Sequence, residues 1–286
     1  MSRRNFWSCP ICGANMTSFK QIGKSIIYVC EDCDLGVTFP VPKPREPKQL
    51  GYSEKSYIEN TNQYKSNFLS MIKKICKYKH NGKALDIGCG FGLFAYLLSK
   101  KTNFIVSALE PYLNSYFLKD SSVEIISKTL TEYFEVNKKR EKFDLLTMID
   151  VLEHMRNISV LEELRSLCKH KAIVFIQVPN YKSLMAVLCK YWSWWMVEDH
   201  VYHFSPKSLK KLFIKYGFTP LDTYTYENLW DFKKNLDGNF INIRNPILRK
   251  LIKGVCYLSF FPVYIIIRPL IWRLGYGGLI QMTIRF

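Results

Sequence analysis

Four cysteines near the N-terminus have the spacing of a metal site. They form two Cys-x2-Cys pairs, Cys9 with Cys12 and Cys30 with Cys33, which are separated by 17 residues. Thiolates on two tight turns can converge on one ion, and this spacing is typical of a zinc ribbon. Four thiolates complete the coordination sphere of zinc, so we expect a structural ion. The alternative is two unrelated cysteine turns.

A second chemical signal is the glycine-rich turn Asp86-Ile87-Gly88-Cys89-Gly90-Phe91-Gly92, between a predicted strand and a predicted helix. Glycines let the backbone approach a ligand, and the helix N-terminus presents free N–H groups. The spacing G-x-G-x-G differs from the G-x-G-x-x-G of dinucleotide-binding folds. Asp86 favours a cationic ligand group over a pyrophosphate. A plain structural turn is the alternative.

An acidic residue ends the next predicted strand. Glu110 lies 18 residues after Gly92, where a carboxylate can accept hydrogen bonds from both hydroxyls of a ribose. Asp86 and Glu110 together therefore predict a site for a ribose-bearing ligand with a cationic group.

Three histidines lie where a doubly wound sheet would bind its ligands. His154 follows the predicted strand 143–149, and His200 and His203 follow the aromatic stretch 191–195. Such sheets bind ligands beyond the carboxyl ends of their strands, and a histidine can take a hydroxyl proton during a transfer reaction. We expect His200 to be the general base, with His203 and His154 as further candidates. Each could instead be a hydrogen-bonded structural histidine, and the aromatic stretch is either a substrate wall or packing.

The elements that must position these residues alternate between short apolar runs and amphipathic stretches. Continuous apolar strands predict an α/β fold with a parallel sheet covered by helices on both faces. The expected strands are 84–88, 104–109, 123–127, 143–149, 172–178, 218–226 and 277–286. We predict four regions: a zinc ribbon at 1–40, a proline-containing linker at 41–50, the sheet domain at 51–226 and 277–286, and an insertion at 227–276.

The insertion contains an apolar segment with basic flanks. Residues 254–267 are uncharged and number 14, too few to span about 30 Å of hydrocarbon as a helix. The flanking cations are Arg244, Arg249, Lys250, Lys253, Arg268 and Arg273. This pattern suits an interfacial element whose cations meet anionic headgroups, and a buried helix or an oligomer contact is the alternative.

Charge and cysteine content indicate partners and compartment. The formal net charge of +17 favours a polyanionic partner, either nucleic acid or an anionic membrane surface. Nine cysteines, together with an N-terminus that has no secretory h-region, predict a reducing compartment. We therefore expect a cytoplasmic protein that is peripheral on the cytoplasmic face of the membrane.

Over about residues 50–226 the chain resembles the class I S-adenosylmethionine-dependent methyltransferases. The resemblance rests on four stretches in order: DIGCGFG at 86–92, ALEP at 108–111, FDLLTMIDVLEHM at 143–155 and DHVYHFSPKSLKKLFIKYGF at 199–218. It implies a Rossmann-like sheet of seven strands in the order 3-2-1-4-5-7-6, with the seventh antiparallel. It also implies S-adenosylmethionine as the methyl donor.

The resemblance assigns roles to residues by motif position. The backbone of the glycine-rich turn, at Gly88, Cys89, Gly90 and Gly92, would hold the methionine part, and Glu110 the ribose. The adenine would contact Thr129 and Leu130. The residues that would border the methyl donor are Asp150, Val151 and Leu152.

The acceptor is predicted from similarity to methyltransferases of surface-polysaccharide and sugar-modification pathways, together with the zinc ribbon and the insertion. We expect O-methylation of a sugar hydroxyl on a glycan or a lipid-linked glycan. An RNA base methyltransferase is the alternative that the charge and the ribbon would suit. Many methyltransferases that act on exocyclic amines of bases carry an Asn/Asp-Pro-Pro-aromatic motif after the fourth strand. This chain has Ile149-Asp150-Val151-Leu152 there, which disfavours such an acceptor. A catalytically silent, cofactor-binding scaffold is an alternative of another class.

Overall fold

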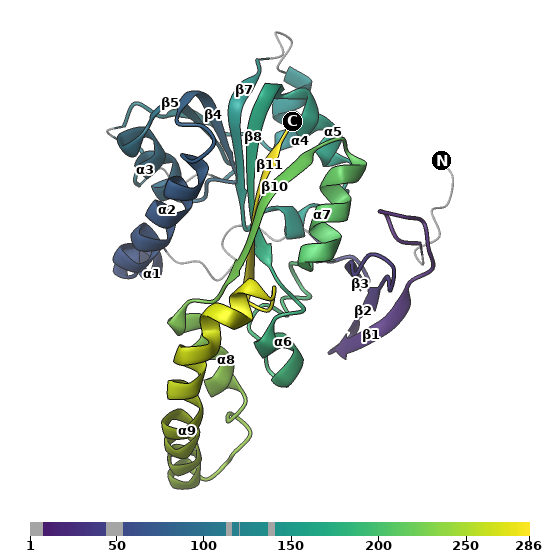
Figure 1. Cartoon of the computed structure of the whole chain (residues 1–286), viewed down its shortest axis with the longest axis vertical. Coiled ribbons are helices and arrows are strands. Elements are labelled where there is room, and N and C mark those ends of the chain that lie inside the picture. The colour runs from purple at the N-terminus through teal and green to yellow at the C-terminus, as the bar shows by residue number, and fades with distance from the viewer. Residues whose placement is uncertain (1–7, 44–53, 113–115, 120, 137–140) are drawn as a thin grey trace. The chain divides into compact units, whose positions relative to one another are not determined.

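The computed structural model describes residues 8–43, 54–112, 116–119, 121–136 and 141–286 (Figure 1). Two compact units differ in their bounds from the predicted domains. Unit 1 consists of Met1–Pro42, Val178–Lys211 and Thr223–Gln281. Unit 2 consists of Lys43–Gln177, Leu212–Asp222 and Met282–Phe286. The segment 178–211 and most of the predicted insertion thus group with the cysteine-rich N-terminus.

A seven-stranded sheet forms the centre of the fold. From edge to edge its strands are β10 (Thr219–Tyr226), β11 (Leu279–Arg285), β8 (Cys168–Pro179), β7 (Phe143–Ile149), β4 (Asn81–Ile87), β5 (Asn103–Leu109) and β6 (Glu124–Ile126). The ladders from β8 to β6 are parallel. Counted along the chain this order is 3-2-1-4-5-7-6, which confirms the predicted fold.

The last strand runs against its neighbour. At the start of β8, the Lys171 N–H donates to the Phe286 carbonyl at the end of β11, at 3.0 Å. At the other end of β8, the Asn180 N–H donates to the Gly278 carbonyl, just before β11, at 2.9 Å. The two strands are therefore antiparallel, as the resemblance implies.

The apolar core of unit 2 holds the carboxyl ends of β4, β5 and β7 in place. Helices α2 (Thr61–Ile75) and α3 (Leu93–Lys101) pack on this core, with Leu93, Phe94 and Leu98 of α3 almost completely buried. Each such side chain stabilises the fold by about 1.5–3 kcal/mol through burial. The remaining helices of the sheet region are α1 (Glu54–Glu59), α4 (Leu130–Val136), α5 (Val160–Ser166) and α7 (Pro206–Lys215).

A second, four-stranded sheet lies in unit 1. Its strands are β1 (Thr17–Ile22), β2 (Ser25–Val29), β3 (Gly36–Phe39) and β9 (Tyr202–His203), all paired antiparallel. The pairing of Gly36 with His203 and of Val37 with Tyr202 joins a distant segment to the ribbon. The ribbon is therefore built from more of the chain than the predicted residues 1–40.

The core of unit 1 joins the ribbon to helices α6 (Leu184–Leu188), α8 (Leu229–Gly238) and α9 (Pro246–Arg273). Ile27 and Val29 of β2 belong to the same buried cluster as Trp192, Phe232 and Tyr264. The Phe232 and Tyr264 rings stack at a centroid distance of 3.9 Å, which packs α8 against α9.

Helix α9 corrects the expected length of the apolar segment. It contains 28 residues and is long and apolar enough to cross a membrane, by length and composition alone. The Asn245 side chain caps it by accepting from the Ile247 and Leu248 N–H groups, and Pro246 fits the first turn. Because the flanking cations other than Arg244 also sit in helical backbone, the helix does not end where the uncharged segment ends. The length-based exclusion of a span was therefore wrong.

Candidate cofactor site and zinc site

The glycine-rich turn connects β4 to α3 and needs glycine for two separate reasons. Gly88, Gly90 and Gly92 have φ values of 70°, 54° and 84°, which disfavour residues with a Cβ. A Cβ on Gly88 would overlap Val151, and one on Gly92 would lie 2.5 Å from Leu118. Around Gly90, no heavy atom of the described residues lies within 4 Å of such a Cβ. The middle of the turn therefore borders open space that a ligand can occupy.

Glu110 is fixed beside this turn. The Gly90 N–H donates to its Oε2 at 3.1 Å, and the Tyr112 N–H donates to its Oε1 at 3.3 Å. Burial raises the pKa of the carboxyl, while the two backbone donors lower it. Each oxygen has lone-pair capacity beyond its backbone bond, so both can accept from a vicinal diol. The placement agrees with the predicted ribose contact.

Asp86 brings a buried acid to the same end of the sheet. The Thr147 hydroxyl donates to its Oδ1 at 2.6 Å, whereas Oδ2 is buried without a partner among the described residues. Desolvation is the main reason that its pKa rises to about 7, and the charge of Glu110 adds to the rise. An orphaned carboxyl oxygen is stabilised by a cationic group. The residues present therefore fit a ligand with a ribose and a positive charge.

The end of β7 lies beside the turn. Val151 faces Gly88, Leu152 is buried, and Asp150 has a φ of 55° that reverses the chain. The Gln177 amide donates to both Asp150 carboxylate oxygens, at 3.0 and 3.2 Å. Gly88 and Val151 are thus brought together as the resemblance implies.

Glu153 is a residue that the sequence analysis missed. It is 1% exposed, and neither carboxyl oxygen has a hydrogen-bond partner among the described residues. Desolvation, followed by the charge of Asp150, raises its pKa well above the ordinary value. Its burial therefore favours the protonated, neutral form of the carboxyl. The signal for Glu153 in the sequence is its position just past the predicted strand 143–149, next to His154.

The two cysteine turns of unit 1 have the same backbone hydrogen bonds. The Gly13 N–H donates to the Cys9 carbonyl and the Asp34 N–H donates to the Cys30 carbonyl, at 2.7 Å each. Gly13 and Asp34 both have positive φ, 80° and 55°, so each turn closes one residue after its second cysteine. Two matching turns therefore present their sulfurs in the same way.

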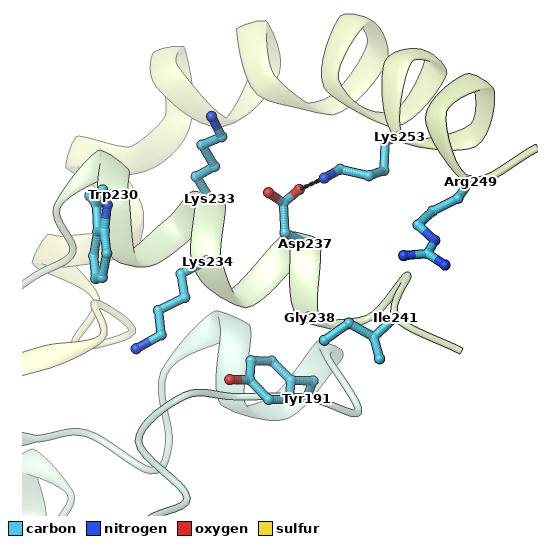
Figure 2. A pocket seen from close by; sticks show the side chains of 9 residues that line it. All are labelled: Tyr191, Trp230, Lys233, Lys234, Asp237, Gly238, Ile241, Arg249 and Lys253. Carbon is cyan, nitrogen blue, oxygen red and sulfur yellow. Dashed lines mark ion pairs between the residues drawn. The ribbon is translucent and has the colours of Figure 1, made fainter. Parts of the chain in front are cut away.

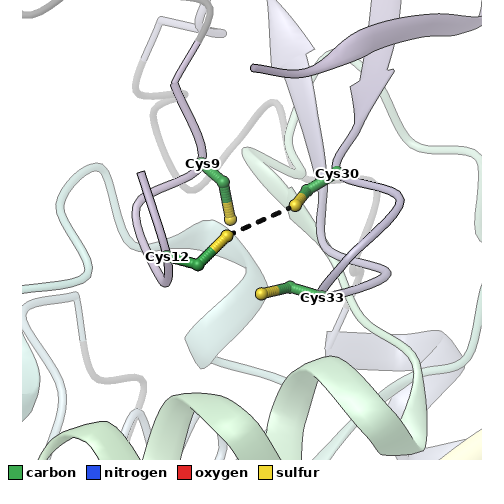
Figure 3. Close-up of side chains that lie close together, drawn as sticks. All are labelled: Cys9, Cys12, Cys30 and Cys33. Carbon is green, nitrogen blue, oxygen red and sulfur yellow. Dashed lines mark hydrogen bonds between the residues drawn. The ribbon is translucent and has the colours of Figure 1, made fainter. Parts of the chain in front are cut away.

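The four sulfurs converge on one point (Figure 3). All four Sγ atoms lie within 4.8 Å of one another, and those of Cys12 and Cys30 are 3.6 Å apart. Burial raises the pKa of the Cys9 thiol to about 11, so buried thiolates here need a cation. Four thiolate ligands without carboxylates select a soft ion such as zinc. The cluster can hold one structural zinc ion and leaves no protein ligand position open.

Residues 58–223, more than half of the chain, match the family described as Methyltransferase domain. The chain belongs to this family. The described fold and the fit of the glycine-rich turn identify it as a class I S-adenosylmethionine-dependent methyltransferase, and hence an enzyme.

Individual relatives are more distant. An uncharacterised protein of Methanocaldococcus jannaschii is 33% identical over 118 residues, which cover 41% of this chain and about half (49%) of that protein. A ubiquinone biosynthesis O-methyltransferase of Bartonella quintana is 27% identical over 178 residues, covering 56% and 72% of the two chains. A crystal structure of an S-adenosylmethionine-dependent methyltransferase from Archaeoglobus fulgidus shares the fold. It has a TM-score of 0.54 and 16% identity, and the match covers 82% of this chain and all of that one.

The predicted adenine residues of the methyltransferase begin α4. The Thr129 N–H and hydroxyl donate to Glu132 Oε2 at 2.7 and 2.9 Å, and the Glu132 N–H donates back to the Thr129 hydroxyl at 3.2 Å. This is a capping box, which occupies the threonine side chain. Leu130 is buried. An adenine contact at Thr129 would therefore use its backbone, and the role stays a prediction.

The three candidate histidines have different surroundings. His203, in β9, is buried with Nε2 2.8 Å from the Thr38 hydroxyl, and burial lowers its pKa to about 3. A histidine that is neutral at all ordinary pH values favours the structural alternative for this residue. His200 is also buried, with its ring centroid 6.2 Å from that of His203. His154 is exposed at the end of a 3-10 turn, Leu152–His154. Their catalytic roles remain predictions.

The aromatic stretch contributes to packing. Trp192 is buried in the core cluster of unit 1. Trp195 lies near the rings of Tyr181 and His203, at centroid distances of 6.4 and 5.5 Å, and the Lys20 ammonium sits 5.1 Å over its ring. These contacts support the packing alternative for Trp192 and Trp195.

Proposed function

We propose that this methyltransferase methylates a hydroxyl group, most specifically a sugar hydroxyl of a glycan or lipid-linked glycan, at an anionic membrane surface on its cytoplasmic side. The observation that carries the location is α9, whose outward side chains include Leu258 and Ile266, 81% and 78% exposed. So large an apolar surface marks an interaction site. The O-methyltransferase named among the relatives supports an oxygen acceptor.

The chain's residues divide the work of a displacement reaction. S-adenosylmethionine, when bound, supplies the electrophilic methyl group. The glycine-rich turn holds the methionine part, Glu110 orients the ribose, and the buried Asp86 carboxyl compensates positive charge. A hydroxyl acceptor must lose its proton as the new carbon–oxygen bond forms, and we assign this proton to His200.

Packing between α8 and α9 supports an in-plane position for α9 over a transmembrane one. The polar helix α8 runs along α9, and Asp237 of α8 pairs with Lys253 of α9 at 2.8 Å. A spanning α9 would carry this ion pair and the α8 lysines into hydrocarbon, which costs several kcal/mol. A helix at the interface leaves the charges in water while its apolar side chains enter the lipid.

The net charge of +17 favours RNA as a second candidate acceptor. Labelled S-adenosylmethionine distinguishes the two candidates when the protein is incubated with separate lipid, glycan and RNA fractions. We expect label in the glycan or lipid-linked glycan fraction, released by glycosidase and stable to ribonuclease. Label that appears only in RNA would overturn the proposal, and binding without transfer to any fraction would favour a scaffold.

The assignment of His200 has its own test. Because a positioned base contributes about 10²–10⁴-fold in rate, His200→Ala should lower kcat by about that factor while cofactor affinity stays within a few fold. A shift in the pH–rate profile should accompany the loss. His203→Ala and His154→Ala are the comparison variants, and a larger loss of kcat in either moves the role to that residue.

A further inference from the structure

An open pocket lies between α8 and the first turns of α9 (Figure 2). Its volume is about 460 Å³, enough for a small polar headgroup. Four cationic side chains line it, Lys233 and Lys234 from α8 and Arg249 and Lys253 from α9. The residues that line it define the α8–α9 pocket, which lies wholly within unit 1. None of them belongs to the predicted cofactor, catalytic or zinc site.

The charge balance of the pocket leaves cations available. Its carboxylate, Asp237, is already engaged by Lys253 and accepts from the Tyr257 hydroxyl at 3.0 Å. Arg249 donates from its Nε to the Ile243 carbonyl at 2.9 Å, which fixes the guanidinium, and its terminal nitrogens have no acceptor among the described residues. The Lys234 ammonium lies 5.2 Å over the Trp230 ring. Arg249, Lys233 and Lys234 can therefore receive an anion, and an arginine fork matches a phosphate.

A second, apolar hollow adjoins the pocket. It has a volume of about 290 Å³ and is lined by Leu229, Lys233, Tyr257 and Phe261. Lys233 belongs to both. A cationic pocket next to an apolar hollow fits an amphiphile, with an anionic head in the first and an apolar chain at the second.

The exposed face of α9 continues this arrangement. Large apolar side chains project outward at positions spaced three, four or eight residues apart, Ile247, Leu251, Val255, Leu258, Ile266 and Leu270. Side chains at this spacing lie on one face of a helix. A free phosphate would use the cations alone, whereas a membrane lipid would use the cations, the hollow and this face together.

We propose that the α8–α9 pocket binds the phosphate-bearing headgroup of an anionic membrane lipid. The inference rests on the membrane association proposed above and adds a specific site to it. Arg249 binds the phosphate, the α8 lysines that line the same pocket add positive charge, and α9 lies in the plane of the interface with its apolar face in the acyl region. The enzyme is thereby seated by a recognised headgroup in addition to diffuse attraction between charges.

Sedimentation of the full chain with vesicles tests this proposal. One set contains phosphatidylcholine with phosphatidic acid, and the other contains phosphatidylcholine brought to the same zeta potential with a fatty acid. We expect binding about tenfold or more tighter to the phosphatidic acid vesicles, since charged hydrogen bonds to phosphate are lost in the other set. Arg249→Glu and Lys234→Glu should abolish that preference.

The matched control is Lys250→Glu, an exposed residue of α9 that does not line the pocket and makes the same change in net charge. It should weaken binding to both vesicle sets alike and keep the preference. Equal loss of preference in Arg249→Glu and Lys250→Glu would overturn the pocket, as would equal binding of the native protein to both sets. Binding to neither set would overturn the membrane association itself, without bearing on methyl transfer measured with soluble acceptors.

A third measurement separates the lipid from a free anion. Calorimetry with inorganic phosphate should give an affinity far weaker than that for the phosphatidic acid vesicles, because only the headgroup contacts are made. Inorganic phosphate that binds as tightly as the vesicles would overturn the assignment to a lipid.

Discussion

The glycine-rich turn of unit 2 and the cysteine turns of unit 1 reach defined shapes by different means. Both use residues with positive φ, Gly88 and Gly90 in one case and Gly13 and Asp34 in the other. The glycine-rich turn is held in place on both sides, because β4 before it and α3 after it pack into the large apolar core of unit 2. The cysteine turns are held by short strands and by sulfurs that need an ion. One site is shaped by its scaffold, and the other by its ligand.

The two sites also differ in what offsets the cost of burying ionisable groups. The scaffold of unit 2 buries Asp86, Glu110 and Glu153, and this burial raises the pKa values of their carboxyls. The ribbon has few buried apolar residues with which to offset four clustered thiols. A stable core thus permits a cofactor site that is strained until it is filled, whereas a small module requires its metal in order to fold.

Removing zinc should give the largest effect and separates the two sites. Structural zinc contributes on the order of 10–16 kcal/mol to the folding of such modules. In Cys33→Ser, hydrogen exchange should show loss of protection in β1, β2 and β3, while the glycine-rich turn keeps its protection. Elemental analysis should find one zinc per native chain and none in the variant.

The control is Cys256→Ser, because Cys256 lies outside the four-cysteine cluster. It should retain zinc and full protection. Native protein that contains no zinc, or a ribbon unaffected by Cys33→Ser, would contradict the distinction between the two sites.

Substitution of Glu110 should give the next largest effect, confined to ligand binding. Glu110→Ala loses the acceptors for a ribose and the bond to Gly90, so cofactor affinity should fall by about 2–4 kcal/mol. Glu110→Gln keeps one acceptor and should lose about half as much. Titration calorimetry measures both, with exposed Glu162→Ala as the control. Unchanged affinity in Glu110→Ala would remove the ribose assignment.

The pH dependence of stability should be the most gradual of the three effects. The folded protein holds a proton on Asp86 up to a pKa of about 7, whereas the unfolded chain loses it near the ordinary value of 3.8. The folded state therefore binds more protons in this window, and the free energy of unfolding should fall as pH rises from about 4 to about 7. The slope from this group is about 1 kcal/mol per pH unit.

Asp86→Asn removes that group while it can keep the hydrogen bond to Thr147. Denaturant unfolding across the window should show a shallower pH dependence in the variant than in the native protein. Other buried acids, such as Glu227 with a pKa of about 7, titrate in the same range, so the difference between the two proteins is the relevant quantity. Identical slopes would show that Asp86 is not protonated as its burial requires.

The sequence was sufficient for the features that depend on local spacing. The glycine-rich turn and the four cysteines follow from short-range patterns that fix backbone geometry, whereas the order of the seven strands was implied by the resemblance to the methyltransferase family. The pairing of His203 with Gly36 does not follow from such patterns, because it joins residues far apart in the chain. A catalytic histidine and a structural, packed histidine cannot be distinguished from the sequence around them, and only the fold shows which contacts the ring makes.

Burial of polar groups was equally hidden. The residue type of Glu153 is typical of a surface position, and only the fold shows that its carboxyl is buried without a hydrogen-bond partner in the part of the chain that the structure describes. The length of α9 was misjudged for a related reason. Charged residues at both ends of the apolar segment predicted the limits of a helix in a membrane. Charge does not end a helix, however, and α9 begins at its cap and continues through these charged residues.

The segment that contains α8 and α9 leaves the sheet after Tyr226 and returns to it at Gly277, beside the end of β10. Gly277 returns so close to β10 that a Cβ there would overlap the backbone of Tyr226, and its N–H donates to the Thr225 hydroxyl at 3.0 Å. With both ends pinned, the entropic penalty of the intervening loop grows only with the logarithm of its length, about 0.6 kcal/mol for each doubling. The hairpin position between the last two strands can therefore accept segments of widely different length without disturbing strand register.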